Sequence, residues 1–419
     1  MRVAFKLGKA KEIEKFQPDV VGVSNTMTAS TGATLEVVSM AKNQGSLVVL
    51  GGHHATFEAE NLLKNNDVDV IVRGEGENTF YELMNALSYK SKDISNISGL
   101  SFRHDGRIIH NSPRPFEKDL DKFPVLDRSL LPKVNKYPYH FFGLKIDSVE
   151  TTRGCPFTCK FCSVKAFYQR LWRKHSESRV IEEIASIRSR GIRDVAFVDD
   201  MFNLDTSRVE RICNSLKENG LTDMSFFCQA RVDTTAKSPD VVEKMADIGF
   251  SLVFLGIESP SADNLANIQK RITLDQVKKS VEILHDNNIA VWGAYIIGNV
   301  NETLDDIKKT IEFALSLDTD IAQFAIMTPL PGTELFQEIE SQIIVKDWQK
   351  YDFLNCVYKP NFLQPKEVDE WVIKAYKKSY LRAKTVQKFA MTQNRWIQSL
   401  KYCPSTYKKA LRVILNKPP

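Results

Sequence analysis

Short apolar runs alternate with helical patterns along the N-terminal part of the chain. The runs are Asp19–Ser24, Leu47–Gly52 and Val68–Arg73. Between the first two lies ATLEVVSMAKNQG, whose apolar residues recur at helical spacing and whose Gly45 is typical of a helix C-terminus. Strands that alternate with helices form a parallel sheet with helices on both faces. The pattern therefore predicts an α/β domain with Ser24, Gly51 and Gly52 at the carboxyl ends of its strands, where ligands bind such sheets.

A second series of apolar runs follows in the middle of the chain. The runs are Ile146–Thr152, Asp194–Asp200, Met224–Asp233, Ser251–Ser259, Ala290–Asn299 and Asp320–Thr333. Helical stretches such as SPDVVEKMADIG separate them. Strands joined by helical crossovers in this way fit an open, partial (β/α)6 barrel with its function at the carboxyl ends of the strands. Polar residues occur at those ends: Asp199, Asp200, Arg231, Glu258 and Asn299. The structural alternative for each is a strand-end cap or an ion pair.

The remaining segments are a connection and a tail. From about Ser91 to Tyr139 the sequence predicts a small hairpin, with an Asp-Gly turn in RHDGR, and then a proline-rich linker. After the last predicted strand, EVDEWVIKAYKKSYLRAKTVQKFA has apolar residues at helical spacing, so the C-terminal region is predicted to be mainly helical.

Composition and charge limit the class of protein. The chain has 419 residues, 43% apolar and 26% charged, which is globular and long enough for more than one core. The N-terminus lacks the apolar segment of a signal peptide and no run is long enough to span a bilayer, so we expect a cytoplasmic protein. The net charge is only +5, but Trp371–Pro419 holds twelve Lys or Arg and no Asp or Glu. Such a tail is either a solvated helical surface or a contact for nucleic acid, anionic lipid or an acidic protein.

Three of the seven cysteines lie within TTRGCPFTCKFCSV, as Cys155, Cys159 and Cys162. A structural zinc site needs four ligands, and His175 is the nearby candidate for the fourth. Unrelated buried cysteines would not show this regular spacing. The third interpretation is an iron-sulfur cluster with three protein ligands and one iron open to an exogenous ligand. We favour the third interpretation, because the three thiolates can converge from one loop.

These motifs resemble a known family. CxxxCxxC, with Phe161 before the last cysteine, is the signature of radical SAM enzymes, and PDVVGVS, VVLGGHHAT and DVIVRGEGENTFYEL resemble the cobalamin-binding domain that precedes the barrel in B12-dependent members. The resemblance covers about Phe16 to Thr333. It implies a Rossmann-like cobalamin-binding domain at 1–88, here without its first strand, a linker with a hairpin at 89–142, a radical SAM barrel at 143–336 and a basic, mainly helical region at 337–419.

The resemblance also implies cofactors and residues. Cys155, Cys159 and Cys162 would bind a [4Fe-4S] cluster, whose open iron binds S-adenosylmethionine (SAM). Ser24, Thr26, Gly51 and Gly52 would line the cobalamin pocket. Arg231 would pair with the SAM carboxylate, Glu258 with its ribose or amino group, and Asp199 or Asp200 with the amino group or substrate. The chain departs from the family at IIGNVNET, which lacks the proline of the usual turn, and it has no Asp-x-His-x-x-Gly for a lower axial histidine.

The activity implied by the resemblance is methylation of an unactivated carbon, through a 5′-deoxyadenosyl radical and methylcobalamin. A radical rearrangement, cyclisation or oxidation without methyl transfer is the enzymatic alternative, and a non-catalytic cobalamin- or zinc-binding module is the other. An external electron donor such as ferredoxin or flavodoxin is expected. The substrate is expected to be a protein, a lipid or a small molecule, with no nucleic acid, and the basic tail allows a peripheral membrane contact.

Overall fold

The structure is a computed structural model that describes residues 3–4, 10–89, 93–130, 140–141, 144–382, 385, 387, 391–394 and 396–397. The chain forms two compact units. The first unit combines Met1–Lys118, Phe161–Gln169 and Thr328–Tyr358, and the barrel unit combines Asp119–Lys160, Arg170–Met327 and Lys359–Pro419. This division differs from the predicted domain bounds, because the segments around α6 (Ser163–Tyr168) and α14 (Glu334–Glu338) belong with the N-terminal sheet.

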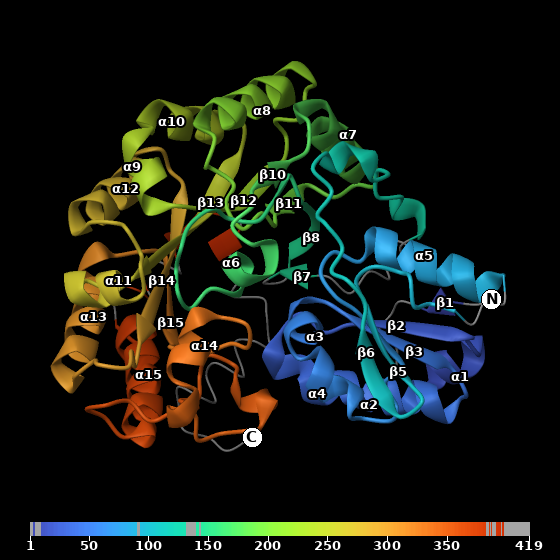
Figure 1. The fold of residues 1–419 in the computed structure, drawn as a ribbon. Helices are drawn as coiled ribbons and strands as arrows, with labels where there is room; N and C mark the ends of the chain where they lie inside the picture. The colour runs from blue at the N-terminus through green and yellow to red at the C-terminus, as the bar shows by residue number, and fades with distance from the viewer. Residues whose placement is uncertain are drawn as a thin grey trace. The chain divides into compact units, whose positions relative to one another are not determined.

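The first unit is built on a six-stranded sheet of order β1-β2-β3-β4-β5-β6 (Figure 1). Its strands are β1 Val3–Ala4, β2 Val20–Ser24, β3 Leu47–Gly51, β4 Val70–Val72, β5 Leu100–His104 and β6 Arg107–His110. Its other helices are α1 Ala10–Phe16, α2 Thr31–Asn43, α3 His53–Phe57, α4 Ala59–Leu63 and α5 Glu77–Ser88. The first four strands are parallel, as the alternating pattern predicts.

Two details of this sheet correct the sequence prediction. A first strand is present: β1 pairs in parallel with β2, but its two residues are too few to give a recognisable apolar run. The predicted hairpin is also no separate linker element, since β5 pairs antiparallel with β4 and β6 completes the sheet. Phe102 of β5 lies opposite Val70 and packs in the same apolar cluster.

Both faces of the sheet are covered because successive strand residues point to opposite sides. Val21 and Val23 of β2 pack with Val38 of α2 in one cluster. Val20, their neighbour, packs in a second cluster that includes Leu83 of α5. The strands are therefore apolar on both faces, which explains their unbroken runs of Val, Ile and Leu.

The barrel unit holds a seven-stranded sheet of order β15-β14-β13-β12-β11-β8-β7 (Figure 1). Its strands are β7 His140–Phe141, β8 Leu144–Val149, β11 Asp194–Phe197, β12 Ser225–Ala230, β13 Phe250–Glu258, β14 Ala290–Ile297 and β15 Ile321–Ile326. The six from β8 to β15 are parallel and follow chain order, and β7 pairs antiparallel with β8. A small separate pair, β9 Thr152–Arg153 and β10 Arg173–Lys174, flanks the cysteine segment. The predicted open (β/α)6 barrel is confirmed.

The crossovers between these strands are helical. The helices are α7 Glu177–Ser189, α8 Thr206–Glu218, α9 Val232–Lys237, α10 Pro239–Asp247, α11 Ala262–Asn267, α12 Leu274–Asp286 and α13 Leu304–Leu317. Several of them start at a side-chain cap that accepts a backbone N–H three residues on, as Asp205 does for α8 and Thr273 for α12. Thr303 caps α13 in a reciprocal capping box with Asp306, so the start of this crossover helix is specified locally.

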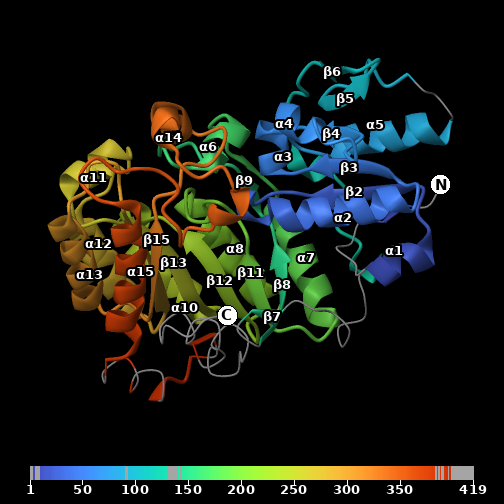
Figure 2. The same ribbon diagram turned by 90° about the horizontal axis from the view of Figure 1, so that it is seen from below.

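The C-terminal region packs onto the barrel sheet. Helix α15, Pro365–Tyr380, lies along β15 (Figure 2), where the Tyr376 hydroxyl donates to the Phe324 carbonyl at 2.9 Å and accepts from the Phe324 N–H at 3.2 Å. Tyr380 makes the same pair of bonds to Ala322 at 2.9 and 3.1 Å. Further on, Trp396 is fully buried and its Nε1 donates to Ser225 Oγ at 2.8 Å.

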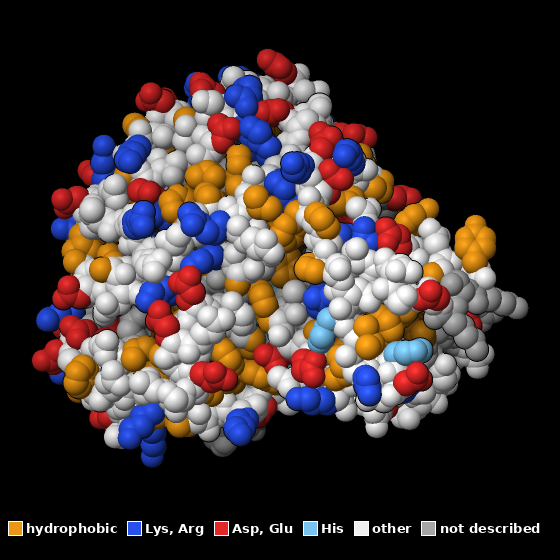
Figure 3. All heavy atoms as spheres, in the orientation of Figure 1, with side chains coloured by type: hydrophobic (Ala, Val, Ile, Leu, Met, Phe, Trp, Pro, Cys, Tyr) orange, Lys and Arg blue, Asp and Glu red, His pale blue; other side chains and the backbone are white. Residues whose placement is uncertain are grey.

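Charged side chains of both signs lie on the surface of the molecule (Figure 3). The face shown in Figure 3 carries Lys and Arg side chains among Asp and Glu side chains. No helix among the described residues is long and apolar enough to cross a bilayer. Of the basic tail Trp371–Pro419, which the sequence offers as a membrane contact, residues 398–419 lie outside the described residues.

Candidate active site

The three spaced cysteines lie in the segment that connects β9 to α6. Cys155 and Cys159 belong to the barrel unit, while Cys162 belongs to the first unit and precedes α6 as its cap residue. All three side chains are half-buried. Burial raises the pKa of the Cys155 thiol, and because a metal binds the thiolate, cluster binding has to release this proton. Within the described ranges, no three His, Cys, Asp or Glu side chains are arranged as a metal site, so the argument for a cluster rests on spacing.

His175, the candidate for a fourth zinc ligand, has another role in the structure. It is 5% exposed, and its Nδ1 lies 3.0 Å from the Asp121 carboxylate. The Ser176 N–H donates to the same carboxylate at 3.1 Å. The imidazole thus joins residue 121 to the start of α7, which favours the iron-sulfur interpretation of the cysteines over a Cys3His zinc site.

Asp199 follows β11 and anchors the strand end that leads into the cysteine segment. Its Oδ1 accepts the backbone N–H groups of Thr151 and Thr152, both at 2.6 Å, and its Oδ2 accepts the Thr151 hydroxyl at 2.7 Å. The side chain is fully buried, and burial raises its pKa to about 6 despite these hydrogen bonds. Both oxygens are therefore engaged within the protein, which indicates a positioning role.

Asp200 points to the next part of the same segment. Its Oδ2 accepts the Gly154 N–H at 3.2 Å, one residue before Cys155. Burial raises the pKa of Asp200 to about 6, and the nearby Glu150 contributes in the same direction. Asp200 is close enough to Cys155 to raise the pKa of that thiol.

Arg231 follows β12 and covers the cysteine segment. Its guanidinium carbon lies 3.6 Å from the ring centroid of Phe157, which stands between Cys155 and Cys159 in the sequence. The side chain is 5% exposed, with Nε 2.6 Å from Asp233 and Nη2 donating to the Arg271 carbonyl at 3.1 Å. Stacking on an aromatic face and carboxylate pairing suit a guanidinium better than an ammonium.

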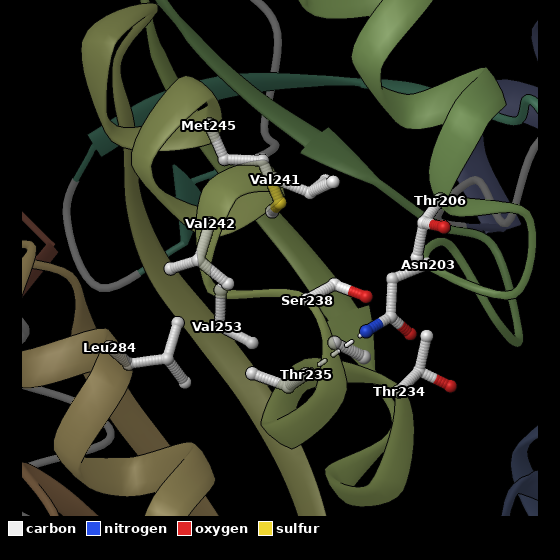
Figure 4. A pocket seen from close by; sticks show the side chains of 11 residues that line it. Asn203, Thr206, Thr234, Thr235, Ser238, Val241, Val242, Met245, Val253 and Leu284 are labelled. Atoms are coloured by element: carbon white, nitrogen blue, oxygen red, sulfur yellow. Dashed lines mark hydrogen bonds between the residues drawn. The ribbon is translucent and has the colours of Figure 1, made fainter.

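Ala230, the residue before Arg231, lines a small cavity together with Asn203 and Thr235 (Figure 4). Asn203 Oδ1 accepts the Arg231 N–H at 2.9 Å, and Asn203 Nδ2 donates to Thr235 Oγ1 at 3.0 Å. The cavity that Asn203 and Thr235 line measures about 10 Å³, which is the space of one water molecule. The Asn203 side chain fixes the backbone at Arg231. The cavity itself is too small for a cofactor.

Glu258 ends β13 with a left-handed backbone, φ 66°. It is 6% exposed, and its Oε1 accepts a hydrogen bond from Lys270 Nζ at 2.8 Å. The strand register shifts between Gly256 and Glu258, so a bulge re-aims the glutamate at the carboxyl edge of the sheet. Lys270 was not predicted, because it lies in a connecting segment that carries no motif of its own.

The loop after β14 is organised by Glu302. This buried carboxylate accepts the Asn299 N–H at 3.0 Å and the Gly298 N–H, and it accepts Asn264 Nδ2 at 3.2 Å. Burial raises the pKa of Glu302 to about 7. The turn at IIGNVNET, which lacks the proline of the usual family turn, is thus held by the carboxylate of Glu302.

In the first unit, the predicted cobalamin residues meet at the carboxyl ends of β2 and β3. Ser24 lies opposite Gly51 in the sheet register, and its hydroxyl lies 3.1 Å from that of Thr26. Gly52 has φ 98°, and a Cβ there would lie 2.9 Å from both the Asn25 carbonyl oxygen and Thr26 Oγ1. Glycine is therefore required at position 52 because the backbone there lies close to Asn25 and Thr26 of the neighbouring loop.

A cavity of about 170 Å³ opens beside these residues, wholly within the first unit. It is lined by Thr26, Met27, Thr28, His53, His54, Phe57, Ser163, Leu330, Pro331, Tyr351 and Phe353. His54 is 2% exposed, and its Nδ1 lies 3.1 Å from Thr28 Oγ1. Its Nε2 is buried without a hydrogen-bond partner among the described residues, and burial lowers the pKa of His54 to about 4.

His53 and His54 were not assigned to the site from sequence, although they follow the paired glycines directly. His53 stacks on Phe167 with the ring centroids 3.9 Å apart, and His54 meets Trp348 edge-on at 5.3 Å. Phe167 and Trp348 come from the two later segments of the first unit, and no sequence pattern indicates that these segments return to the N-terminal sheet.

The fold and the site define a radical SAM enzyme with a B12-binding domain. Residues 149–314 match the radical SAM superfamily and residues 9–84 match the B12 binding domain. An uncharacterized methyltransferase of Pyrococcus horikoshii is 37% identical over 388 residues, which are 90% of this chain and 82% of that protein. The chain belongs to the cobalamin-dependent radical SAM family, as its motifs predict.

Two other similarities are to a related enzyme and to a solved structure. The anaerobic magnesium-protoporphyrin IX monomethyl ester cyclase of Cereibacter sphaeroides is 28% identical over 89% of this chain, which spans 61% of that protein. The structure of the radical SAM methyltransferase TsrM from Kitasatospora setae, with cobalamin and a [4Fe-4S] cluster bound, aligns with a TM-score of 0.69 over 80% of this chain and 69% of that one. At 18% identity this second likeness concerns the fold.

Proposed function

We propose that the protein methylates an unactivated carbon of its substrate, using a [4Fe-4S] cluster, SAM and cobalamin. One observation carries the proposal: a single chain joins a B12-binding sheet to a radical SAM barrel, and a methyltransferase matches it at 37% identity over both parts. When bound, the cofactors supply one-electron cleavage of SAM and a transferable methyl group. The protein has to hold them, orient the substrate and exclude water.

Cys155, Cys159 and Cys162 would hold the cluster through thiolates. Their spacing and half-buried side chains fit a cluster that keeps one iron open. Asp199 and Asp200 fix the backbone at Thr151 and Gly154, on the N-terminal side of Cys155. We assign both aspartates to positioning this segment, with Asp200 as the one that also faces the cluster or substrate.

Arg231 and Glu258 are assigned to SAM. The Arg231 guanidinium lies over the ring of Phe157, between the first two cysteines in the sequence, and can pair with a carboxylate. Glu258 keeps a carboxylate at the end of the next strand, where it can accept hydrogen bonds from ribose hydroxyls or an amino group. Lys270 fixes its orientation through Oε1.

The first unit is assigned to cobalamin. Ser24, Thr26, Gly51 and Gly52 form the strand-end rim, and the adjoining cavity contributes the unpartnered Nε2 of His54. A buried imidazole that the pKa shift keeps neutral can donate or accept one hydrogen bond to a polar group of the cofactor. His54 Nε2 is buried in this cavity without a hydrogen-bond partner among the described residues, as expected of a group that binds a ligand there.

A second candidate is radical cyclisation or oxidation without methyl transfer. The 28% identity to the anaerobic cyclase over 89% of the chain favours it. Either reaction needs one electron from outside, so a ferredoxin- or flavodoxin-like donor is part of the proposal. The substrate is a protein, a lipid or a small molecule.

The test uses the anaerobically reconstituted, cobalamin-loaded full chain with a chemical reductant and SAM labelled in its methyl group. Methyl transfer predicts S-adenosylhomocysteine and label in the corrin fraction, together with slow release of 5′-deoxyadenosine. Label that stays wholly in methionine while 5′-deoxyadenosine forms would reject methylation in favour of the second candidate. Cys159→Ala is expected to abolish 5′-deoxyadenosine, and protein that binds zinc in place of iron and sulfide would overturn both.

A further inference from the structure

Lys270 carries a largely buried ammonium group on the segment between α11 and α12. Its side chain is 12% exposed, and its Nζ lies 2.8 Å from Glu258 Oε1. Gly256 makes room for this ion pair: a Cβ there would lie 2.7 Å from Lys270 Nζ and 2.6 Å from Glu258 Oε1. The absence of a side chain at Gly256 therefore leaves the space that the ion pair occupies at the end of β13.

Backbone hydrogen bonds on both sides of Lys270 join this segment to the candidate site. The Lys160 N–H donates to the Ile268 carbonyl at 3.1 Å, which brings the residue after Cys159 against the segment. Arg231 Nη2 donates to the Arg271 carbonyl at 3.1 Å. The Lys270 N–H itself donates to the Leu265 carbonyl at 2.8 Å, so the residue that carries the cation is fixed.

The charged neighbours of Lys270 keep it protonated. Burial alone would lower the pKa of Lys270. The charges of Glu258 and Cys159 and the hydrogen bond to Glu258 outweigh burial and the opposing charge of Arg231, so the pKa of Lys270 is raised overall. The geometry agrees, since the Ile268 carbonyl, two residues before Lys270, accepts the N–H of the residue after Cys159. The Lys270 ammonium is therefore carried by a segment that is hydrogen-bonded to the cysteine segment beside Cys159.

We propose that Lys270 tunes the reduction potential of the cluster bound through Cys159, with Glu258 as its opposing partner. The inference rests on the proposed function, because it requires the cluster. Reduction adds one electron and hence one negative charge, so a nearby cation stabilises the reduced form and raises the potential, and a nearby carboxylate lowers it. In a poorly solvated site neither charge is fully screened.

The test is the midpoint potential of the reconstituted cluster in full-length protein, measured without SAM by electron paramagnetic resonance during a redox titration. Lys270→Met is expected to shift the one-electron equilibrium roughly tenfold toward the oxidised form, which is about 59 mV lower. Glu258→Gln is expected to shift it upward. Lys270→Arg, which keeps the charge, is expected to restore the wild-type potential, and Lys308→Met, at an exposed ion pair, to leave it unchanged.

An electrostatic role predicts that Lys270→Met and Glu258→Gln shift the midpoint potential in opposite directions, whereas a structural role does not. If Lys270→Met and Glu258→Gln move the potential in the same direction, or neither moves it in protein with full iron content, the inference is wrong while the proposed function stands. If the wild-type chain assembles no cluster, the proposed function itself fails. Where Lys270→Met does not assemble a cluster, Lys270→Gln and Glu258→Gln carry the same sign test.

Discussion

Asp199 holds Thr151 by two hydrogen bonds, one from the backbone N–H at 2.6 Å and one from the hydroxyl at 2.7 Å. We expect Asp199→Ala to lower the free energy of unfolding of the barrel by about 3 kcal/mol, because it leaves buried donors unsatisfied. Asp199→Asn keeps an acceptor for both backbone donors and is expected to cost about 1 kcal/mol. Urea denaturation measures both values, and equal losses in the two variants would contradict the anchoring role.

Glu302 predicts a pH dependence of stability. Its pKa is about 7 in the folded protein and 4.5 without burial, so the folded state binds the additional proton between these values. The contribution of Glu302 is complete below about pH 4.5 and is lost as the pH rises to about 7, a change of about 3 kcal/mol. Glu302→Gln is expected to remove this part of the slope in urea denaturation between pH 5 and 8. A variant with the wild-type slope would exclude the raised pKa.

Gly51 and Gly52 provide a matched pair of substitutions. Gly52→Ala places a Cβ against the Asn25 carbonyl at φ 98° and is expected to cost about 1–3 kcal/mol. Gly51→Ala meets nothing closer than 3.6 Å and is expected to be tolerated. Thermal denaturation of the two variants side by side checks the difference. Equal melting temperatures would show that the close approach at Gly52 is relieved by movement of the loop.

His54 is expected to contribute to cobalamin binding. His54→Phe keeps the aromatic contact with Trp348 but removes Nε2, and the loss of about 1 kcal/mol corresponds to a roughly fivefold weaker affinity. Titration with hydroxocobalamin, followed by absorbance, measures this change. His104→Ala, at a side chain that is 70% exposed, is the control and is expected to bind as the wild type does. Unchanged affinity in His54→Phe would remove His54 from the site.

Arg231→Lys tests the assignment of Arg231 to SAM. The substitution keeps the charge but loses the planar group that lies 3.6 Å from Phe157, so we expect a roughly tenfold weaker SAM affinity in the reconstituted enzyme. Equilibrium dialysis measures it. Arg193→Lys, at a partly exposed ion pair with Asp223, is the control. If both variants bind SAM equally well, the carboxylate is held elsewhere.

The sequence predicted those parts of the molecule that local patterns determine. The parallel strands are visible because both of their faces are buried, which gives continuous apolar runs, and the cysteines are visible because their spacing is itself the signal. The strand-end residues Asp199, Arg231 and Glu258 were placed at the correct edge of the sheet.

The sequence did not predict contacts that depend on distant segments. Lys270 meets Glu258 only because a segment twelve residues further on folds back over β13. His54 gains its cavity from residues 330–353, which join the first unit after the barrel is complete. The role of Asp199 also depends on tertiary structure, since the donors that saturate it lie nearly fifty residues earlier in the chain.

The tyrosines of α15 have a consequence for the behaviour of the barrel in solution. A sheet that does not close ends in a strand whose N–H and C=O groups are a template for a second chain, and such strands promote aggregation. Tyr376 and Tyr380 occupy the N–H and C=O of Phe324 and Ala322 with hydroxyl groups, as an adjacent strand would. Two tyrosine hydroxyls on one helix therefore satisfy the edge of the open barrel and protect it from pairing with a strand of a second chain.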